Sequence, residues 1–251
     1  MLITAPETGR LKMKIGILAT GITPDELIHQ FGSYSEMFMQ LFKNNGYEFE
    51  YEIYDVRDNV FPKSENECDA WLITGSKFNV YQNLEWMQTL KAFILAVHAS
   101  QKPMVGICFG HQIIAEAFGG KVDKYPGGWG VGLHSYALSG DHDFINDGSR
   151  DFTINAMHQD QVLVKPENAV IFAQSEFCEY AGLVYDDRIM TFQAHPEFSV
   201  DYEDALVEAR KGPVVPMDVA EDGLRTLRVS GAKTESNKVA HWMADFIKTR
   251  V

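Results

Sequence analysis

Residues 106–112 (GICFGHQ) place a cysteine where an apolar strand-like run meets a helix-like run. Gly106 and Gly110 flank Cys108 two positions away on each side. Glycines allow close packing around a strained backbone, which is the arrangement of a nucleophile elbow with Cys in place of Ser. A helix N-terminus also favours the thiolate, the nucleophilic form of the thiol. We therefore expect Cys108 to be a nucleophile rather than a buried packing residue.

A base for such a nucleophile lies in residues 193–198 (QAHPEF), at the end of another apolar run. His195 and Glu197 are two residues apart, so on an extended backbone their side chains project to the same side. The carboxylate can then hold the imidazole in the tautomer that accepts a proton from the thiol. The pattern predicts a catalytic triad of Cys108, His195 and Glu197.

The segments before these residues alternate between strand-like and helix-like patterns. Short apolar runs that predict strands lie at 15–19, 47–56, 70–74 and 103–108, and helical periodicity lies at 33–44, 84–99 and 113–118. Strands that are apolar on both faces and are separated by helices indicate an α/β fold with a mostly parallel central sheet flanked by helices.

The second half of the chain has a different sequence pattern, with short β-rich runs in place of alternating strands and helices. Short β-rich runs at 131–138, 152–156, 170–173, 179–184 and 189–193 either extend the same sheet or form an additional β-rich layer. The tail predicts helices at 201–210 and 236–248, with an irregular segment over 212–235 that contains Pro and Gly. We expect residues 13–251 to form a single domain with a C-terminal helical addition. Residues 1–12 are expected to be a disordered extension, or Met13 is the natural start.

Composition excludes several classes of function. The 251 residues carry 35 acidic and 22 basic side chains, a net charge of −13, which argues against a nucleic-acid or anionic-membrane partner. The cysteines at 68, 108 and 178 are odd in number and lack C-x-x-C spacing, so we expect free thiols and a cytoplasmic location. No apolar run approaches the roughly 18 residues of a membrane span, and no basic-then-apolar leader is visible.

Taken together, GICFGHQ (106–112) and AHPEF (194–198) resemble the class I, triad-type glutamine amidotransferases. Residues 73–81 (ITGSKFNVY) are similar to the oxyanion strand and loop of that family, and closest to the version in stand-alone GMP synthase-like amidotransferase domains. Residues 157–160 (MHQD) fall where the family has its glutamine-contacting loop. The resemblance covers about residues 14–200 and implies a flavodoxin-like fold.

The resemblance also implies roles for individual residues. Cys108 would be the nucleophile, His195 the acid and base, and Glu197 its orienting group. Backbone N–H groups would form the oxyanion hole at Gly75, Ser76 and Phe109, and the substrate would be held by Gln112, Met157, His158, Gln159 and Asp160. Two features depart from the pattern: Gln159 stands where the GMP synthase sequence has Gly, and residues 212–235 have no counterpart. No metal or cofactor is implied.

Three functions remain open from the sequence. The first is release of ammonia from the glutamine side chain through a γ-glutamyl thioester, by a stand-alone enzyme or by the glutaminase subunit of a separate synthetase. The sequence has no P-loop and no Ser-Gly-Gly-x-Asp-Ser motif, so ATP-dependent activation of an acceptor would need another polypeptide. The alternative is a γ-glutamyl peptidase that cleaves glutathione-like γ-glutamyl amides. The last is a non-enzymatic cysteine-based sensor, which would not need His195 and Glu197.

Other motifs are interpreted as structural. The run 141–143 (DHD) resembles a set of metal ligands, but it follows Ser139-Gly140 in what reads as a solvated turn. His111 and the thiols of Cys68 and Cys178 are expected to be packing groups.

Overall fold

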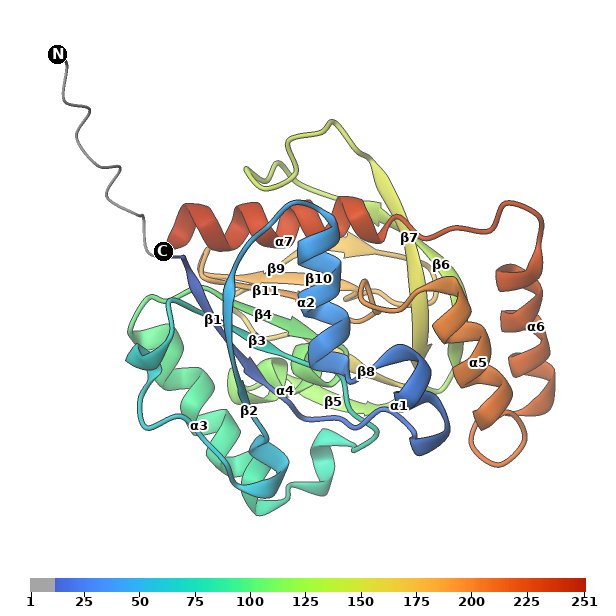
Figure 1. Ribbon diagram of the computed structural model, residues 1–251, viewed down its shortest axis with the longest axis horizontal. Helices are drawn as coiled ribbons and strands as arrows, with labels where there is room; N and C mark the ends of the chain where they lie inside the picture. Colours follow the sequence, from blue (N-terminus) through green and yellow to red (C-terminus); the bar gives the residue numbers. More distant parts are fainter. Residues whose placement is uncertain (1–11) are drawn as a thin grey trace, which may run out of the picture.

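The computed structural model describes residues 12–251, so the expectation for residues 1–11 lies outside the described residues. The chain folds into a central sheet of nine strands with helices on both faces (Figure 1). The strand order is β2-β1-β3-β4-β11-β10-β9-β6-β7. This α/β arrangement confirms the fold class predicted from the alternating strand and helix patterns.

One half of this sheet is parallel. Its strands, in spatial order, are β2 (Glu50–Tyr54), β1 (Lys14–Leu18), β3 (Ala70–Ile73), β4 (Met104–Ile107) and β11 (Ile189–Phe192). Because β3, β4 and β11 are parallel neighbours, the residues that follow them meet at one edge of the sheet. That edge, at the carboxyl ends of the strands, is where open α/β sheets bind ligands.

The β-rich second half mostly extends this sheet. Antiparallel pairing joins β11 to β10 (Gly182–Tyr185), β9 (Ala169–Gln174), β6 (Gly130–Leu138) and β7 (Asp151–His158). The separate β-rich layer is smaller than the sequence suggested, because it consists of the ribbon of β5 (Lys121–Lys124) and β8 (Asp160–Val164). Neither strand of this ribbon was expected from the sequence.

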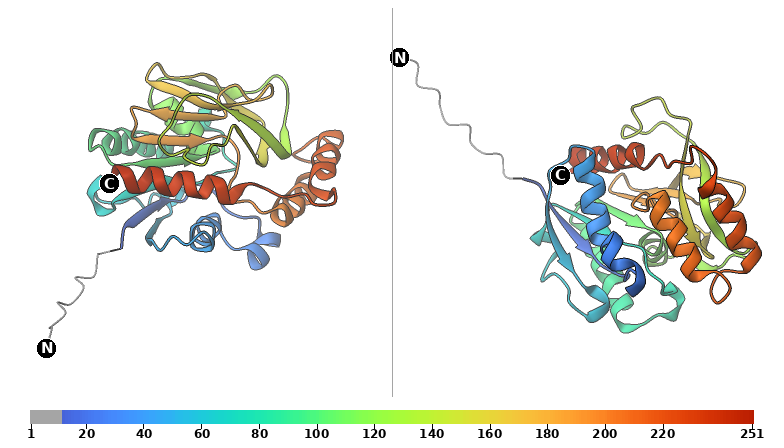
Figure 2. Two further views of the ribbon diagram at one scale, coloured as in Figure 1. Left: turned by 90° about the horizontal axis from the view of Figure 1, so that it is seen from above. Right: turned by 45° about the vertical axis from the view of Figure 1, so that its right-hand side comes forward.

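Helices cover the two faces of the sheet (Figures 1 and 2). The segments are α1 (Asp25–Phe31), α2 (Tyr34–Asn44), α3 (Glu85–Ala99), α4 (Phe109–Ala117), α5 (Val200–Arg210), α6 (Met217–Arg228) and α7 (Ser236–Arg250), with short 3₁₀ turns at Val56–Asp58, Glu65–Glu67 and Val80–Gln82. The Ser33 hydroxyl caps α2 by accepting from the Glu36 N–H at 3.2 Å.

Two apolar cores lie on opposite faces of the sheet. On one face Phe38 and Phe42 of α2 and Trp242 of α7 pack against buried strand residues. On the other face Trp86 of α3 and Ile113 of α4 are among the residues that pack against it. With both faces covered, β3, β4 and β11 are fully buried, which explains why they read as continuous apolar runs.

The prediction that residues 212–235 are irregular is wrong, because α6 occupies half of this segment. Ala220, Gly223, Leu224 and Leu227 recur at helical spacing and are buried against β6, in a cluster that contains Val131. Gly223 weakens the helical propensity of the segment, but a Cβ at this position would lie 2.6 Å from Val131 Cγ1. The close approach of α6 to β6 therefore requires glycine, and packing overrides propensity.

The helices α5 and α6 also complete the hydrogen bonding of β6, whose pairing with β9 is limited to Ala137 and Leu138. The Thr226 hydroxyl accepts from the Leu133 N–H at 2.9 Å, and the Glu203 carboxyl accepts from the Gly132 N–H at 3.4 Å. The two helices therefore serve as a cover for an otherwise open strand edge. No helix within residues 12–251 is long and apolar enough to cross a membrane.

Candidate active site

Cys108 lies at the turn between β4 and α4, with φ 51° and ψ −101°. A non-glycine residue in this region costs about 1–3 kcal/mol and persists only where its surroundings hold it. Two backbone hydrogen bonds hold it here. The Cys108 N–H donates to the Phe192 carbonyl at 2.8 Å, and the Cys108 carbonyl accepts from the Gln112 N–H at 3.0 Å. The structure thus places Cys108 in the strained elbow that its sequence predicted.

The residues that flank Cys108 must be glycines, because a side chain at either position would clash with the neighbouring backbone. A Cβ on Gly106 would lie 2.8 Å from the Gly110 carbonyl group, and one on Gly110 would lie 2.5 Å from the Ile73 carbonyl oxygen. Both distances are shorter than real Cβ contacts, so a side chain at either position would push β3, β4 and α4 apart. The glycines at 106 and 110 therefore set the position of the elbow relative to β3.

His195 and Glu197 follow β11, the parallel neighbour of β4. His195 Nδ1 lies 2.8 Å from Glu197 Oε1, and both side chains are buried. The His195 N–H donates to the Asn155 carbonyl at 2.8 Å, and the imidazole stacks on the Phe198 ring with centroids 4.0 Å apart and planes 4° from parallel. The ring is thus fixed at its edge by a carboxylate and on one face by an aromatic side chain.

The surroundings of His195 favour its charged form. Burial lowers the pKa of His195, but the Glu197 carboxylate and the Cys108 thiol raise it by more, so the net pKa lies well above its usual value. Glu197 has no second partner among the described residues, because its Oε2 is buried without a hydrogen bond. The arrangement is suited to a thiolate and an imidazolium held side by side.

Gly75, the second residue after β3, completes the immediate surroundings of the thiol. A Cβ on Gly75 would lie 2.8 Å from His195 Cε1 and 3.6 Å from Cys108 Cβ. Within residues 12–251 the peptide N–H groups of Gly75, Ser76 and Phe109 donate to no acceptor, whereas the Ser76 hydroxyl donates to the Thr20 carbonyl at 2.7 Å. These free N–H groups on neighbouring elements are suited to binding an anionic oxygen.

Cys108 and His195 line a cavity of about 430 Å³, which is within the size range of small-molecule sites. Its walls come from the loop after β1, the loop after β3, the α4 N-terminus, the corner between β7 and β8, and the end of α5 with the turn that follows. The lining residues are Ile22, Pro24, Tyr34, Ser76, Lys77, Phe78, Asn79, Cys108, Gln112, Lys124, Trp129, Met157, His158, Gln159, Asp160, His195, Phe198, Leu206, Arg210, Pro213 and Val214. Glu197 is not on the wall, because it lies behind His195.

The residues expected to hold substrate all line this cavity, and Gln112 has an additional structural role. Its Nε2 donates to the Asp160 carbonyl at 2.9 Å and lies 3.2 Å from Gln193 Oε1. Burial raises the pKa of Asp160, and hydrogen bonds from Asn79 and Tyr81 oppose this effect. Gln112 therefore supports the β7–β8 corner, and the Asp160 carboxylate is the anionic group of the wall.

His158 and Gln159 occupy the same corner with different exposure. Burial lowers the pKa of His158 to about 3, so this imidazole is neutral at physiological pH. Gln159 is partly exposed on the cavity wall, and its carbonyl accepts from the Tyr125 N–H at 3.1 Å. Its side chain adds polar volume where the GMP synthase-like pattern has glycine.

The motifs interpreted as structural have structural partners. Asp143 of the DHD turn pairs with Arg250 at 2.8 Å, and within the described residues no group of His, Cys, Asp and Glu is arranged to hold a metal. His111 Nδ1 lies 2.8 Å from the Thr191 hydroxyl, and burial lowers the pKa of this imidazole to about 3. Cys68 and Cys178 are buried free thiols, which confirms the expectation from the sequence.

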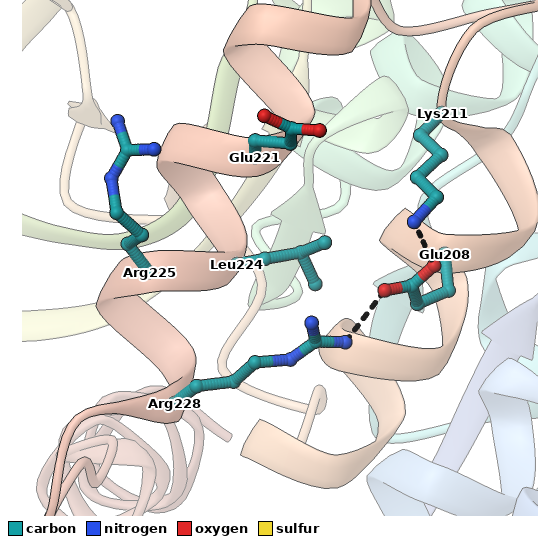
Figure 3. Close-up of a pocket in the computed structure, with 6 residues that line it drawn as sticks. All are labelled: Glu208, Lys211, Glu221, Leu224, Arg225 and Arg228. Atoms are coloured by element: carbon teal, nitrogen blue, oxygen red, sulfur yellow. Dashed lines mark hydrogen bonds and ion pairs between the residues drawn. The ribbon is translucent and has the colours of Figure 1, made fainter.

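A second hollow lies on the outer side of α5, between this helix and α6 (Figure 3). It measures about 360 Å³ and is lined by Glu208, Lys211, Glu221, Leu224, Arg225 and Arg228. Glu208 pairs with Lys211 and, at 2.7 Å, with Arg228. We call this second hollow the outer groove. Its lining holds neither a free nucleophile nor a buried base.

Sequence reasoning missed the part of the cavity wall that comes from α5 and the turn after it. Leu206, Arg210, Pro213 and Val214 lie beyond the motifs of the triad, and nothing in their local sequence indicates a site. It also missed Glu203 of α5, which is fully buried and has a pKa raised to about 8 by that burial. The available signal was an acidic residue among the apolar positions of a helix.

Comparisons with known proteins agree with this geometry. A sequence model described as "Glutamine amidotransferase class-I" matches residues 26–211. A Saccharomyces cerevisiae protein with a provisional glutamine amidotransferase name is 35% identical over 202 residues, covering 75% of this chain and 80% of that protein. Gamma-glutamyl peptidase 3 of Arabidopsis thaliana is 30% identical over 178 residues, covering 67% of this chain and 70% of that protein.

Two further proteins are similar over a shorter region or in fold. A glutamine-hydrolysing GMP synthase subunit of Methanopyrus kandleri is 38% identical over 101 residues, covering 38% of this chain and 51% of that protein. The crystal structure of a glutamine amidotransferase from Methylobacillus flagellatus superimposes with a TM-score of 0.68 at 22% identity, covering 96% of this chain and 95% of that one. The chain belongs to the class I glutamine amidotransferase family.

Proposed function

We propose that the chain hydrolyses the γ-carboxamide of glutamine or of a related γ-glutamyl compound, with Cys108 as nucleophile, His195 as acid and base, and Glu197 as the group that orients His195. The observation that carries this proposal is the buried His195–Glu197 pair, 2.8 Å between Nδ1 and Oε1, beside a cysteine held in a strained elbow. A structural histidine or a packing thiol would need neither arrangement.

In the first step the Cys108 thiolate attacks the γ-carbonyl carbon and forms a carbon–sulfur bond. The carbonyl oxygen becomes an oxyanion, for which the free N–H groups of Gly75, Ser76 and Phe109 are the proposed donors. His195 gives its proton to the amide nitrogen, the carbon–nitrogen bond breaks, and a γ-glutamyl thioester remains. The raised pKa of His195 supports its role as the proton donor in this step.

In the second step His195 accepts a proton from water, and the resulting hydroxide attacks the thioester carbon. The carbon–sulfur bond breaks, glutamate leaves, and the thiolate and imidazolium are restored. The Asp160 carboxylate, fixed by Asn79 and Tyr81, is the proposed partner of the substrate α-amino group.

With glutamine as substrate, the leaving group is ammonia. Membership of the class I glutamine amidotransferase family supports glutamine as the substrate. Similarity to a GMP synthase subunit makes a separate synthetase a candidate partner. The second candidate function is a γ-glutamyl peptidase, whose leaving group is an amine. It is favoured by similarity to Arabidopsis proteins with that name over two thirds of this chain. A cysteine sensor without catalysis has less support, because it leaves the His195–Glu197 pair without a role.

Incubation of the purified protein with glutamine and with γ-glutamyl dipeptides, followed by assays for ammonia and free glutamate, tests the proposal. We expect glutamate release by the wild type and none above background by Cys108→Ala. Cys68→Ala is the matched control, because Cys68 is also buried but lies away from the cavity, and it should retain activity. Equal glutamate release by Cys108→Ala and wild type would overturn the assignment, and an inert wild type would favour the sensor.

A further inference from the structure

The part of the cavity wall that comes from α5 and its following turn has no role in the chemistry described so far. Leu206 and Arg210 belong to the last turns of α5, and Pro213 and Val214 to the turn between α5 and α6. Ile22, from the loop after β1, lines the same cavity, and both Ile22 and Val214 are about half exposed although they are large apolar residues. A glutaminase whose leaving group is ammonia needs no such wall.

The charges on the cavity wall differ from those of the whole chain. The chain has 22 basic and 35 acidic residues, whereas the cavity lining has Lys77, Lys124 and Arg210 against Asp160 alone. None of these three cations lies within 4 Å of a carboxylate in the part of the chain that the structure describes. The cavity is therefore a cationic region in an acidic protein, and it attracts anions.

The free cations belong to different parts of the wall. Lys124 lies on β5, opposite Asp160 of β8 in the ribbon register, so it belongs to the part proposed to hold the glutamyl α-amino and α-carboxylate groups. One cation there balances the α-carboxylate. Arg210 comes from α5, a different element, and has apolar neighbours on the wall in Leu206, Pro213 and Val214. With the glutamyl end at the ribbon and the γ-carbon at Cys108, the remaining wall faces the leaving group.

On the basis of the proposed function, we propose that the amide nitrogen of the substrate carries an apolar, carboxylate-bearing substituent, and that Arg210 and the α5–α6 turn select it. The substrate class is then a γ-glutamyl amino acid or peptide with a free carboxylate, rather than glutamine. Guanidinium suits this task because it binds a carboxylate through two parallel hydrogen bonds. Arg210 would be a specificity residue, with no part in proton transfer.

The test uses two substrates that differ only in the charge in question, γ-glutamyl-alanine and γ-glutamyl-alaninamide, with release of glutamate as the readout. We expect kcat/KM of the wild type to be about 10- to 100-fold higher for the carboxylate form, the usual range for hydrogen bonds to a charged group. Equal values for the two substrates would overturn the inference and leave the proposed hydrolysis intact. Failure to cleave either substrate or glutamine would overturn the proposed function itself.

Three variants assign the preference to Arg210. Arg210→Gln should reduce the ratio of the two kcat/KM values toward one, and Arg210→Lys should retain part of it. Lys211→Gln is the matched control, because this neighbouring cation lies in the outer groove and pairs with Glu208 (Figure 3), so the ratio should not change. Lys124→Gln should lower kcat/KM for both substrates alike. An unchanged ratio in Arg210→Gln, with wild-type circular dichroism and Tm, would contradict the assignment to Arg210.

Discussion

The cavity and the outer groove lie on two sides of α5 and are similar in size, about 430 and 360 Å³. Both are lined by basic side chains, and the adjacent residues Arg210 and Lys211 contribute one to each. In the groove Lys211 pairs with Glu208, and Arg228 pairs with Asp204 and Glu208. In the cavity Lys77, Lys124 and Arg210 have no such partners within residues 12–251. Size and charged lining therefore do not identify a site, whereas polar groups without partners do.

The ion pairs also differ in energy. The His195–Glu197 pair is buried, so breaking it leaves an uncompensated group in a medium of low polarity. The pairs of the groove are at least partly exposed and screened by solvent, so they contribute little to stability. Changes of the same kind in the two hollows should therefore have very different effects.

The largest effect is expected from Glu197→Gln. The amide keeps the volume of the side chain but removes the charge that raises the pKa of His195 and selects its tautomer. Loss of the corresponding carboxylate in a serine protease triad lowers kcat by about 10⁴, so we expect a decrease of about 10²- to 10⁴-fold here. Steady-state release of glutamate measures it.

Glu208→Gln is the matched change in the groove, since it also removes a carboxylate that pairs with cations. This variant should retain wild-type kcat. If Glu208→Gln lowered kcat as much as Glu197→Gln does, the distinction between the two hollows would not hold.

A smaller loss is expected from Gly75→Ala, because the new Cβ would lie 2.8 Å from His195 Cε1 and displace the ring from Cys108. Misplacement of a catalytic group by about 1 Å costs about 100-fold, and kcat should fall by that order. Ser76→Ala is the control, since it keeps the peptide N–H and loses only the hydroxyl bond to Thr20. A Gly75→Ala enzyme with wild-type kcat would show that His195 can move without loss of function.

The site was predictable where its residues follow strands. Cys108 and His195 each come directly after or close behind an apolar run, and the carboxyl ends of parallel strands meet at one edge. The adjacency of β4 and β11, which are about 80 residues apart in the chain, could not be read from local patterns. It depends on long-range pairing that only the complete sheet determines.

The wall from α5 and its turn could not be predicted for a related reason. In the sequence, Gly223, Pro213 and Pro216 suggest an irregular segment, and packing of Gly223 and the apolar residues of α6 against β6 makes the helix favourable. Once α6 is in place, α5 and the turn after it are fixed beside the cavity. The side chain of Arg210 reaches the site through tertiary structure, without any local motif.

Glu203 provides a test inside α5, because it is buried there and forms no ion pair among the described residues. Its pKa is raised to about 8, so the native state keeps a proton that the unfolded chain loses near pH 4.5. The contribution of Glu203 to the free energy of unfolding should therefore fall as pH rises from about 5 to 8. Glu203→Gln, which imitates the protonated form, should be more stable than wild type by about 3 kcal/mol near pH 7.

Urea denaturation of Glu203→Gln and wild type at about pH 5 and pH 7.5 measures this difference, which should be several-fold smaller at the lower pH. Contributions from other titrating groups are common to both proteins and cancel. A difference that is the same at both values would mean that Glu203 is ionised in the native state throughout. The burial of this carboxyl would then have to be balanced by a charge close to it.

The smallest effect is expected from Arg228→Gln in the outer groove. The guanidinium donates to both Asp204 oxygens at 2.6 and 2.8 Å and to Glu208 at 2.7 Å, yet it is half exposed. Because solvent screens these pairs, the free energy of unfolding should fall only slightly, and by less at high salt. Glutamate release should not change. A loss of activity without a loss of stability would mean that the placement of α6 affects the placement of Arg210 through α5. The groove would then belong to the site.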